Sequence, residues 1–251
     1  MQNLKVALIQ FNPFWEDIEA NINKLDMVFN ALKPDTQLVI LPEMFNTGFS
    51  MNPKKVAENE KGVTYQFMEK WSKKFMICGS FATVIDKGFV NRLYVFDKGN
   101  LIGQYDKRYL FGLGKEDQHY QAGKKQLSLQ INDFKVSFYI CYDLRFPEWL
   151  RNTDHTDVAV IVASWPQKRI EHWDALLKAR AIENQYYVLA CNRVGNDGND
   201  VAHCGHSQII APNGDLIEKL TETEGIVYAE LDKTNITFTR RALPFLKDMK
   251  S

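Results

Sequence analysis

The amino-acid sequence predicts a single α/β domain over residues 1–251. Apolar runs typical of strands alternate with segments in which apolar residues recur at helical spacing. A chain of 251 residues with 45% apolar residues is long enough to bury a large core within one domain. No repeat, low-complexity segment or Pro/Ser-rich linker marks a second domain. Sheets flanked by helices are therefore the expected architecture.

The individual elements follow from hydrophobic periodicity and turn residues. Continuous apolar stretches, such as 37–41, are typical of strands that are covered on both faces. Strands are expected over residues 5–10, 37–41, 76–85, 89–96, 135–141, 157–164, 186–192 and 207–211. Helices are expected over residues 18–32, 64–75 and 171–185. Turns are expected near residues 86–88, 97–100 and 212–214.

Composition narrows the class of partner. Lys and Arg number 31, as do Asp and Glu, so the formal net charge is zero. This balance argues against nucleic acid or an anionic membrane as the partner and favours a small molecule. No stretch approaches the ~20 apolar residues of a membrane span, and a cytoplasmic protein is expected. The four cysteines form no CxxC pair, which favours reduced thiols over a disulfide framework.

Three ionisable residues follow apolar strand-like segments. They are Glu43, Lys107 and Cys141. Strand ends are where α/β folds place their ligands. A thiol attacks an amide as the thiolate, so it needs a base to take its proton and a cation to favour the negative form. Taken singly, each residue has an ordinary alternative, because a cysteine often packs in a core and a Glu or Lys is usually solvated.

Together these residues lie in segments that resemble a known family. LPEMF at 41–45, YDKRYLF at 105–111 and CYDLRFPE at 141–148 look like the three signature segments of the nitrilase (carbon-nitrogen hydrolase) superfamily, in the family's order. The likeness extends over nearly the whole chain, from residue 4 to residue 215. It implies a four-layer α-β-β-α sandwich and a homodimer.

The resemblance also implies a role for each residue of the site. Glu43 would be the general base, Lys107 the oxyanion stabiliser and Cys141 the nucleophile, with the backbone N–H of Tyr142 as a second oxyanion donor. Family members often add a second glutamate between the lysine and the cysteine, and Glu116 lies in that interval. The alternative for Glu116 is a solvated loop charge, since the intervening loop looks shorter than in many relatives.

The flanking segments MFNTGFSM at 44–51, HYQAG at 119–123, CYDLRFPEW at 141–149 and ASWPQKRIEHW at 163–173 look most like the omega-amidase branch. This resemblance implies small dicarboxylate monoamides such as 2-oxoglutaramate and 2-oxosuccinamate as substrates. A distal carboxylate favours a guanidinium, and Arg145 is the nearest candidate. Its alternative is an internal salt bridge that fixes the loop after Cys141. Phe45, Tyr120 and Trp165 would wall a small pocket, or they would simply pack.

Two other functions remain open at this point. One is a different amidase of the same superfamily, such as an N-carbamoyl amine hydrolase, and the other is a non-catalytic binding or assembly module. The cluster His203, Cys204 and His206 matches no zinc spacing, and the loop glycines form no phosphate-binding motif. We therefore expect no metal and no other cofactor.

Overall fold

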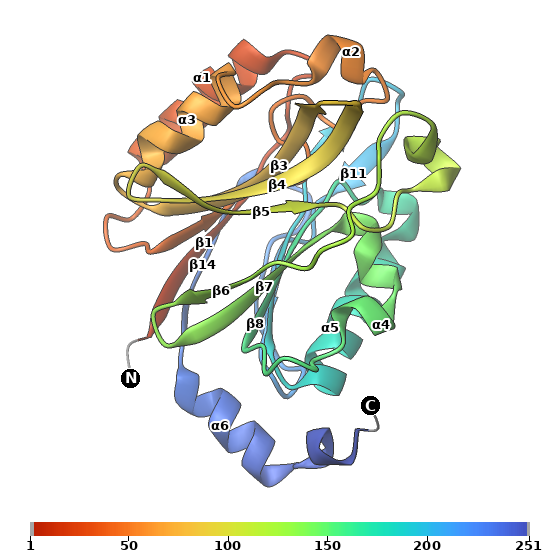
Figure 1. Cartoon of the computed structure of the whole chain (residues 1–251). Coiled ribbons are helices and arrows are strands. Elements are labelled where there is room, and N and C mark those ends of the chain that lie inside the picture. Colours follow the sequence, from red (N-terminus) through yellow and green to blue (C-terminus); the bar gives the residue numbers. More distant parts are fainter. Residues whose placement is uncertain (1–2, 250–251) are drawn as a thin grey trace.

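The computed structural model describes residues 3–249. Within this range the strands form two six-stranded sheets that stack face to face, and one small two-stranded sheet (Figure 1). The first large sheet has the order β14 (Gly225–Leu231), β1 (Leu4–Gln10), β2 (Leu38–Ile40), β3 (Met76–Ile85), β4 (Gly88–Asp97) and β5 (Asn100–Asp106). The second has the order β13 (Leu216–Lys219), β12 (Gln208–Ile210), β9 (Tyr187–Cys191), β8 (Val158–Val162), β7 (Phe134–Ile140) and β6 (Ser128–Ile131). The small sheet pairs β10 (Val194–Asn196) with β11 (Ala202–Cys204).

Helices cover the outer faces of both large sheets, so the molecule has four layers (Figure 1). The longer helices are α1 (Ile18–Asn30), α3 (Val63–Ser72), α5 (Ile170–Asn184) and α6 (Lys233–Ala242), and the short ones are α2 (Pro53–Val56) and α4 (Pro147–Leu150). The first two of the longer helices pack on the first sheet, and α5 packs on the second. The predicted α/β class and the four-layer α-β-β-α sandwich are confirmed.

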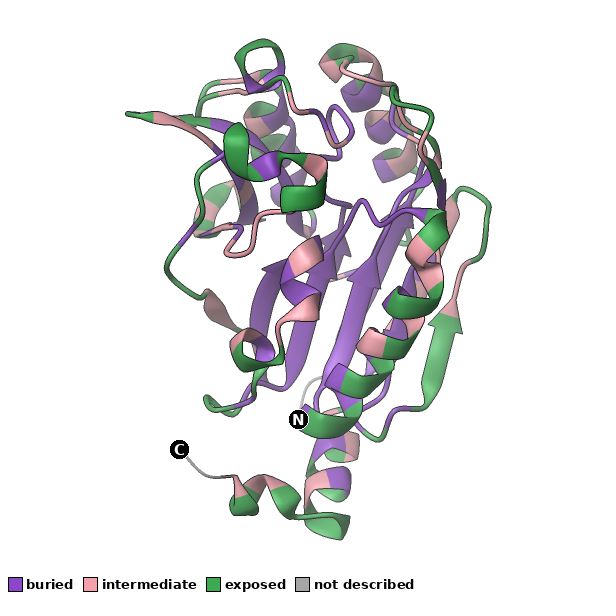
Figure 2. Cartoon of the chain, turned by 90° about the vertical axis from the view of Figure 1, so that its right-hand side faces the viewer, coloured by how far each residue is buried: buried purple, intermediate pink, exposed green. Residues whose placement is uncertain are grey.

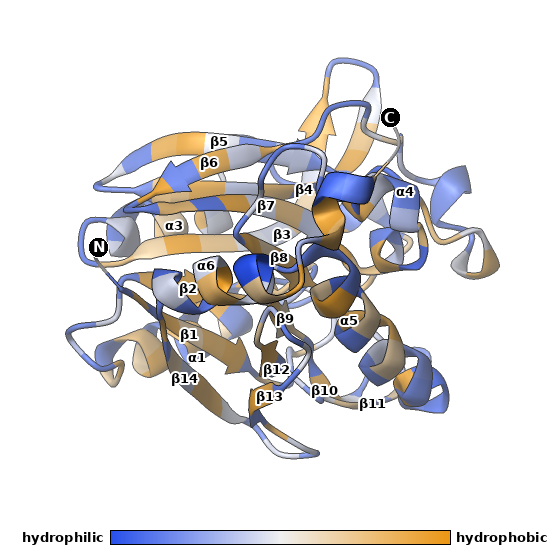
Figure 3. Ribbon diagram, turned by 90° about the horizontal axis from the view of Figure 1, so that it is seen from below, coloured by the Kyte–Doolittle hydropathy of each residue, from blue (hydrophilic) through white to orange (hydrophobic). Residues whose placement is uncertain are grey.

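Most of the hydrophobic core lies between the two sheets. Every residue of β8 is buried, and the strands beside it are also buried along most of their length (Figure 2). These central strands are apolar, as Figure 3 shows from below. A second, aromatic cluster joins the first sheet to its helices, where the ring of Phe29 lies 5.2 Å from Phe67 and 5.3 Å from Trp71. Continuous apolar strands were thus predictable because both of their faces are covered.

Strand direction brings distant segments of the chain to one edge of the sandwich. Strand β2 is parallel to β3, and β5 shares this direction because β3 and β5 are both antiparallel to β4. Strands β7, β8 and β9 are parallel to one another in the second sheet. The loops that follow β2, β5, β7 and β8 meet at one cavity, so residues far apart in sequence become neighbours.

The elements that the sequence analysis did not predict are short or partly exposed. They include β6, β14 and α6, in which buried and exposed residues are mixed, and β13, in which no residue is buried. The last described part of the chain forms a 3-10 turn over Phe245–Asp248, and residues 250 and 251 lie outside the described range. Among residues 3–249 no helix combines the length and the apolar character that crossing a bilayer requires.

The all-buried β8 allows a test of the core. Ile161→Ala removes a fully buried side chain and is expected to lower the free energy of unfolding by about 2–5 kcal/mol, because the cavity left behind does not collapse completely. Ile102→Ala, on the edge strand β5 and 39% exposed, is the matched control and should cost much less. Urea denaturation of both variants measures the difference, and equal losses would contradict the core assignment.

Candidate active site

A buried lysine lies between two buried carboxylates at the shared strand edge. The Lys107 Nζ is 2.7 Å from Glu43 Oε1 and 2.8 Å from Glu116 Oε2. Burial lowers the pKa of Lys107, but the Glu116 and Glu43 carboxylates outweigh burial and hold it above its ordinary value. The ammonium is therefore protonated at neutral pH. Glu116 is fully buried, so the alternative of a solvated loop charge is wrong.

Neutral donors fix the orientation of both carboxylates. Asn91 Nδ2 donates to Glu43 Oε1 at 2.8 Å and to Glu116 Oε1 at 3.2 Å. The backbone N–H of Ser164 donates to Glu43 Oε2 at 2.9 Å, and that of Phe111 donates to Glu116 Oε2 at 2.7 Å. The carboxylate of Glu43 therefore has fixed partners on both oxygens, which gives it one orientation toward the cavity.

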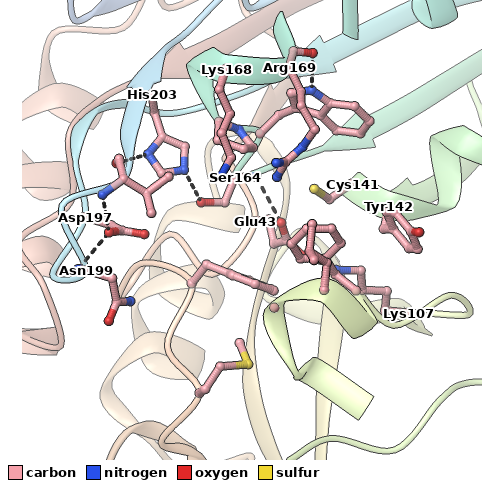
Figure 4. A pocket seen from close by; sticks show the side chains of 18 of the residues that line it. Glu43, Lys107, Cys141, Tyr142, Ser164, Lys168, Arg169, Asp197, Asn199 and His203 are labelled. Carbon is pink, nitrogen blue, oxygen red and sulfur yellow. Dashed lines mark hydrogen bonds and ion pairs between the residues drawn. The ribbon is translucent and has the colours of Figure 1, made fainter. Parts of the chain in front are cut away.

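Cys141 lies at the end of β7 in the left-handed backbone region, with φ of 44°. For a residue with a side chain this conformation is uncommon, and such strain occurs often at functional sites. The thiol lines the same cavity as Glu43 and Lys107 (Figure 4). Burial raises the pKa of the Cys141 thiol and the Glu43 carboxylate raises it further, while Lys107 and the Ser164 N–H lower it. The net direction is upward, so the resting sulfur is a thiol.

The buried carboxyl of Asp143 ties the lysine segment to the cysteine turn. Its Oδ2 accepts from Tyr105 Oη at 2.7 Å and from the Ile140 N–H at 2.9 Å, and its Oδ1 accepts from the Tyr109 N–H at 2.9 Å. Burial raises the pKa of Asp143 to about 6, although these hydrogen bonds oppose the rise. One side chain thus sets the distance between the loops that follow β5 and β7.

The cavity in front of this cluster has a volume of about 220 Å³. Loops after four strands, together with the β10–β11 hairpin, supply its walls (Figure 4). Beside Glu43, Lys107 and Cys141 it is lined by Phe49, Met51, Phe111, Leu113, Gly114, Tyr142, Arg145, Ser164, Trp165, Pro166, Lys168, Arg169, Asp197, Asn199, Val201 and His203. A cavity of this size suits a small molecule.

Three of the five residues predicted to bind substrate line the cavity, namely Tyr142, Arg145 and Trp165. The Arg145 guanidinium lies over the Trp165 ring, 4.6 Å from its centroid, and its nitrogens are 3.4 Å from His172 Nδ1. Within residues 3–249, no carboxylate pairs with Arg145. The alternative of an internal salt bridge is therefore wrong.

The other two predicted pocket residues, Phe45 and Tyr120, do not line the cavity. The backbone turns at Met44, which has φ of 45°, and Phe45 follows it into the aromatic cluster beside Phe67. The hydroxyl of Tyr120 donates to the backbone oxygen of Ser50 at 2.7 Å, behind the site. Both side chains pack, which corrects the prediction that they wall the pocket.

In the segment with His203, Cys204 and His206, the fold directs the two histidine side chains to different partners. His203 lines the cavity, with Nε2 3.4 Å from Ser164 Oγ, whereas His206 Nδ1 lies 2.8 Å from Asp174 Oδ2. Burial lowers the pKa of His203 to about 4, so this imidazole is neutral near pH 7. Among residues 3–249 no three His, Cys, Asp or Glu side chains are grouped to hold a metal.

The comparison with protein families agrees with this geometry. The family model described as carbon-nitrogen hydrolase matches residues 5–241. The chain belongs to the carbon-nitrogen hydrolase family. This carbon-nitrogen hydrolase is 36% identical over 250 residues to omega-amidase YafV of Escherichia coli (strain K12), covering 99% of this chain and 97% of that protein. It is 34% identical over 253 residues to 2-oxoglutaramate amidase of Bacillus subtilis (strain 168), covering 98% and 97% of the two.

Solved structures give the same family. XC1258 from Xanthomonas campestris, described as a CN-hydrolase superfamily protein with an arsenic adduct in the active site, superposes with a TM-score of 0.97 at 33% identity, over 100% of this chain and 98% of that chain. Saccharomyces cerevisiae Nit3, a member of branch 10 of the nitrilase superfamily, gives a TM-score of 0.87 at 29% identity, over 97% and 95% of the two. The predicted membership of the nitrilase superfamily is confirmed.

Sequence reasoning missed several residues of the site. Asn91 lies between Val90 and Arg92 in β4, and this polar interruption of a largely apolar strand was the signal for a buried polar partner. Asp143 lies within the CYDLRFPE segment, two residues after Cys141, and this position was the only sequence signal for its role. Arg169 and Ser164 lie in the segment that was quoted for the omega-amidase likeness, but only the fold shows that they line the cavity.

The position of Glu43 predicts how Cys141 titrates. Since the Glu43 carboxylate raises the pKa of the thiol, Glu43→Gln is expected to move the midpoint of thiol ionisation to lower pH. The rate of iodoacetamide alkylation of Cys141, followed by mass spectrometry across the alkaline range, measures this midpoint. Glu60→Gln, which removes one negative charge at an exposed position, is the control. An unmoved or higher midpoint in Glu43→Gln would show that the two groups do not interact.

Proposed function

We propose that this carbon-nitrogen hydrolase is an omega-amidase that releases ammonia from small dicarboxylate monoamides such as 2-oxoglutaramate and 2-oxosuccinamate. The observation that carries the proposal is the joint position of Cys141, Glu43 and Lys107 on one small cavity, with Glu116 behind the lysine. The similarity to YafV and to the B. subtilis 2-oxoglutaramate amidase supports the choice of substrate.

The first stage forms a thioester. Glu43 takes the thiol proton as the Cys141 sulfur attacks the amide carbon, and the carbonyl becomes an oxyanion. The Lys107 ammonium and the Tyr142 N–H stabilise that oxyanion. The carbon–nitrogen bond then breaks, Glu43 returns the proton to the leaving nitrogen, and ammonia departs.

The second stage releases the acid. Glu43 removes a proton from water, the hydroxide oxygen attacks the thioester carbon, and the same two donors hold the second oxyanion. The carbon–sulfur bond breaks, and the sulfur regains its proton from Glu43. Glu116 acts as a positioning residue, because it keeps the Lys107 ammonium charged and pointed at the cavity.

The charge of the cluster explains why proton transfer accompanies attack. Two carboxylates and one ammonium sum to one negative charge, so a resting thiolate would add a second one in a buried place. The thiol therefore keeps its proton until an electrophilic carbon is present. This arrangement protects the sulfur from reaction with other electrophiles and leaves Glu43 free to act as the base.

The two alternatives are less well supported. A non-catalytic module has no need for a fully buried Lys107 with two carboxylates, because buried ion clusters contribute little net stability compared with apolar packing. An N-carbamoyl amine hydrolase would use the same cluster, and only the substrate distinguishes the two activities.

The homodimer, the single-domain organisation and the cytoplasmic location stay predictions. Exposed apolar side chains on and after α6, namely Phe238, Leu243 and Phe245, are compatible with a dimer interface.

The nucleophile has a direct test. Cys141→Ala is expected to lower ammonia release from 2-oxoglutaramate by several orders of magnitude, because the members of such a cluster act as a unit. Mass spectrometry of the wild-type protein trapped during turnover should show an acyl adduct on Cys141, and the variant should show none. Cys204→Ala, which removes a thiol outside the cavity wall, is the matched control and should keep the adduct. Full turnover in Cys141→Ala would end the proposed mechanism.

A substrate panel tests the proposed specificity. Ammonia release should give a kcat/KM for 2-oxoglutaramate at least about tenfold higher than for glutamine, an aliphatic nitrile or an N-carbamoyl amine, a ratio that corresponds to about 1.4 kcal/mol of transition-state binding. If the N-carbamoyl amine is the best substrate, the enzyme belongs with the alternative amidases.

A further inference from the structure

The charge of the cavity wall differs from that of the whole chain. The chain has no net charge, yet four basic side chains and two acidic ones line the cavity: Lys107, Arg145, Lys168 and Arg169 against Glu43 and Asp197. A positive excess remains when the buried Glu116 behind Lys107 is also counted. A cavity of this charge attracts an anionic molecule.

Arg169 is the most conspicuous of these cations. Its side chain reaches into the pocket on the side of Cys141 (Figure 4). The guanidinium lies 5.2 Å from the centroid of the Phe111 ring, and within the described part of the chain it has neither a carboxylate partner nor a side-chain hydrogen bond. Burial lowers the pKa of Arg169 and the neighbouring Arg145 lowers it further, so the two like charges are close enough to repel one another.

Trp165 holds both arginines in place. Its ring packs under the Arg145 guanidinium, and its Nε1 donates to the backbone oxygen of Arg169 at 2.8 Å. Trp165 is itself fixed, because its backbone N–H donates to Asn192 Oδ1 at 2.7 Å. Among residues 3–249 the acidic residue Asp197 forms no ion pair with either arginine, and its Oδ1 accepts from the backbone N–H groups of Asn199 and Val201. Trp165 therefore contacts both residues. Among residues 3–249 the Arg169 guanidinium has no side-chain hydrogen-bond partner, whereas the Arg145 guanidinium contacts His172 Nδ1 at 3.4 Å.

We propose that Arg169, together with Arg145, forms a carboxylate-binding subsite that selects substrates with an anionic group away from the scissile amide. Planar guanidiniums bind a carboxylate through two parallel hydrogen bonds, which fixes its orientation as well as its charge. The subsite explains how a hydrolase whose reacting cluster recognises any amide prefers dicarboxylate monoamides. The inference deepens the proposed function and rests on it for the reacting group, whereas the anion site itself does not require turnover.

Binding to an unreactive variant tests the subsite. In the Cys141→Ala background, calorimetric titration with glutarate monoamide and with neutral glutarate diamide measures the contribution of the distal carboxylate. Arg169→Gln should weaken monoamide binding at least about tenfold and reduce the preference for monoamide over diamide. The monoamide affinity of Arg169→Lys should lie between the affinities of the Arg169 protein and of Arg169→Gln. Arg151→Gln removes an exposed charge outside the cavity wall and is the control. Unchanged monoamide affinity in Arg169→Gln, or an equal loss in Arg151→Gln, would overturn the subsite.

Kinetics of the enzyme with Cys141 intact separates this role from others. Arg169→Gln should raise KM for 2-oxoglutaramate by more than it lowers kcat, because the carboxylate binds away from the reacting carbon. A loss confined to kcat, and equal for 2-oxoglutaramate and neutral valeramide, would instead show that Arg169 acts on the Cys141 sulfur, and it would reject the subsite. If the monoamide binds in an Arg169-dependent manner but 2-oxoglutaramate releases no ammonia, the subsite stands and the omega-amidase proposal fails. If 2-oxoglutaramate releases ammonia but the monoamide binds independently of Arg169, the omega-amidase proposal stands and the subsite fails.

Discussion

Burying the Lys107 ammonium removes it from water, which costs several kcal/mol unless opposite charges surround it. Glu43 and Glu116 are those charges, and the Asn91 amide bridges the two carboxylates. Glu43 follows β2, Asn91 lies on β4, and Lys107 and Glu116 both lie between β5 and β6, so the ion cluster forms only when the first sheet and the loops beyond it are assembled. The same contacts that neutralise the lysine give Glu43 the fixed orientation that a general base requires.

The sandwich supplies this cluster with its nucleophile through strand direction. Parallel strands in two stacked sheets end at one edge, so the loops after β2, β5, β7 and β8 converge there although the sequence separates them widely. The rigid strands fix the ends of the loops. The loops hold the functional side chains, and the apolar strands stabilise the fold. The positive φ of Cys141 is tolerated because β7 is held on both sides and both faces.

Sequence reasoning succeeded where one physical cause dominates a segment. Strands such as β8 are apolar throughout because both faces are covered, and the residues of the reacting cluster lie in motifs that resemble a family. It failed where three-dimensional packing decides. Phe45 follows Glu43 in the chain, but a turn at Met44 sends its ring into the core. The proposed role of Arg169 depends on its having no carboxylate partner among residues 3–249. No local sequence pattern predicts that an arginine will lack such a partner.

The carboxyl of Asp143 has a mechanical consequence. Because it bonds to Tyr105, Tyr109 and Ile140 at once, the loop that carries the lysine and the strand that carries the cysteine move as one unit. The two sheets cannot slide past each other at this edge without breaking a buried three-way tether. The buried tether therefore holds the sulfur of Cys141 and the ammonium of Lys107 at a nearly constant spacing.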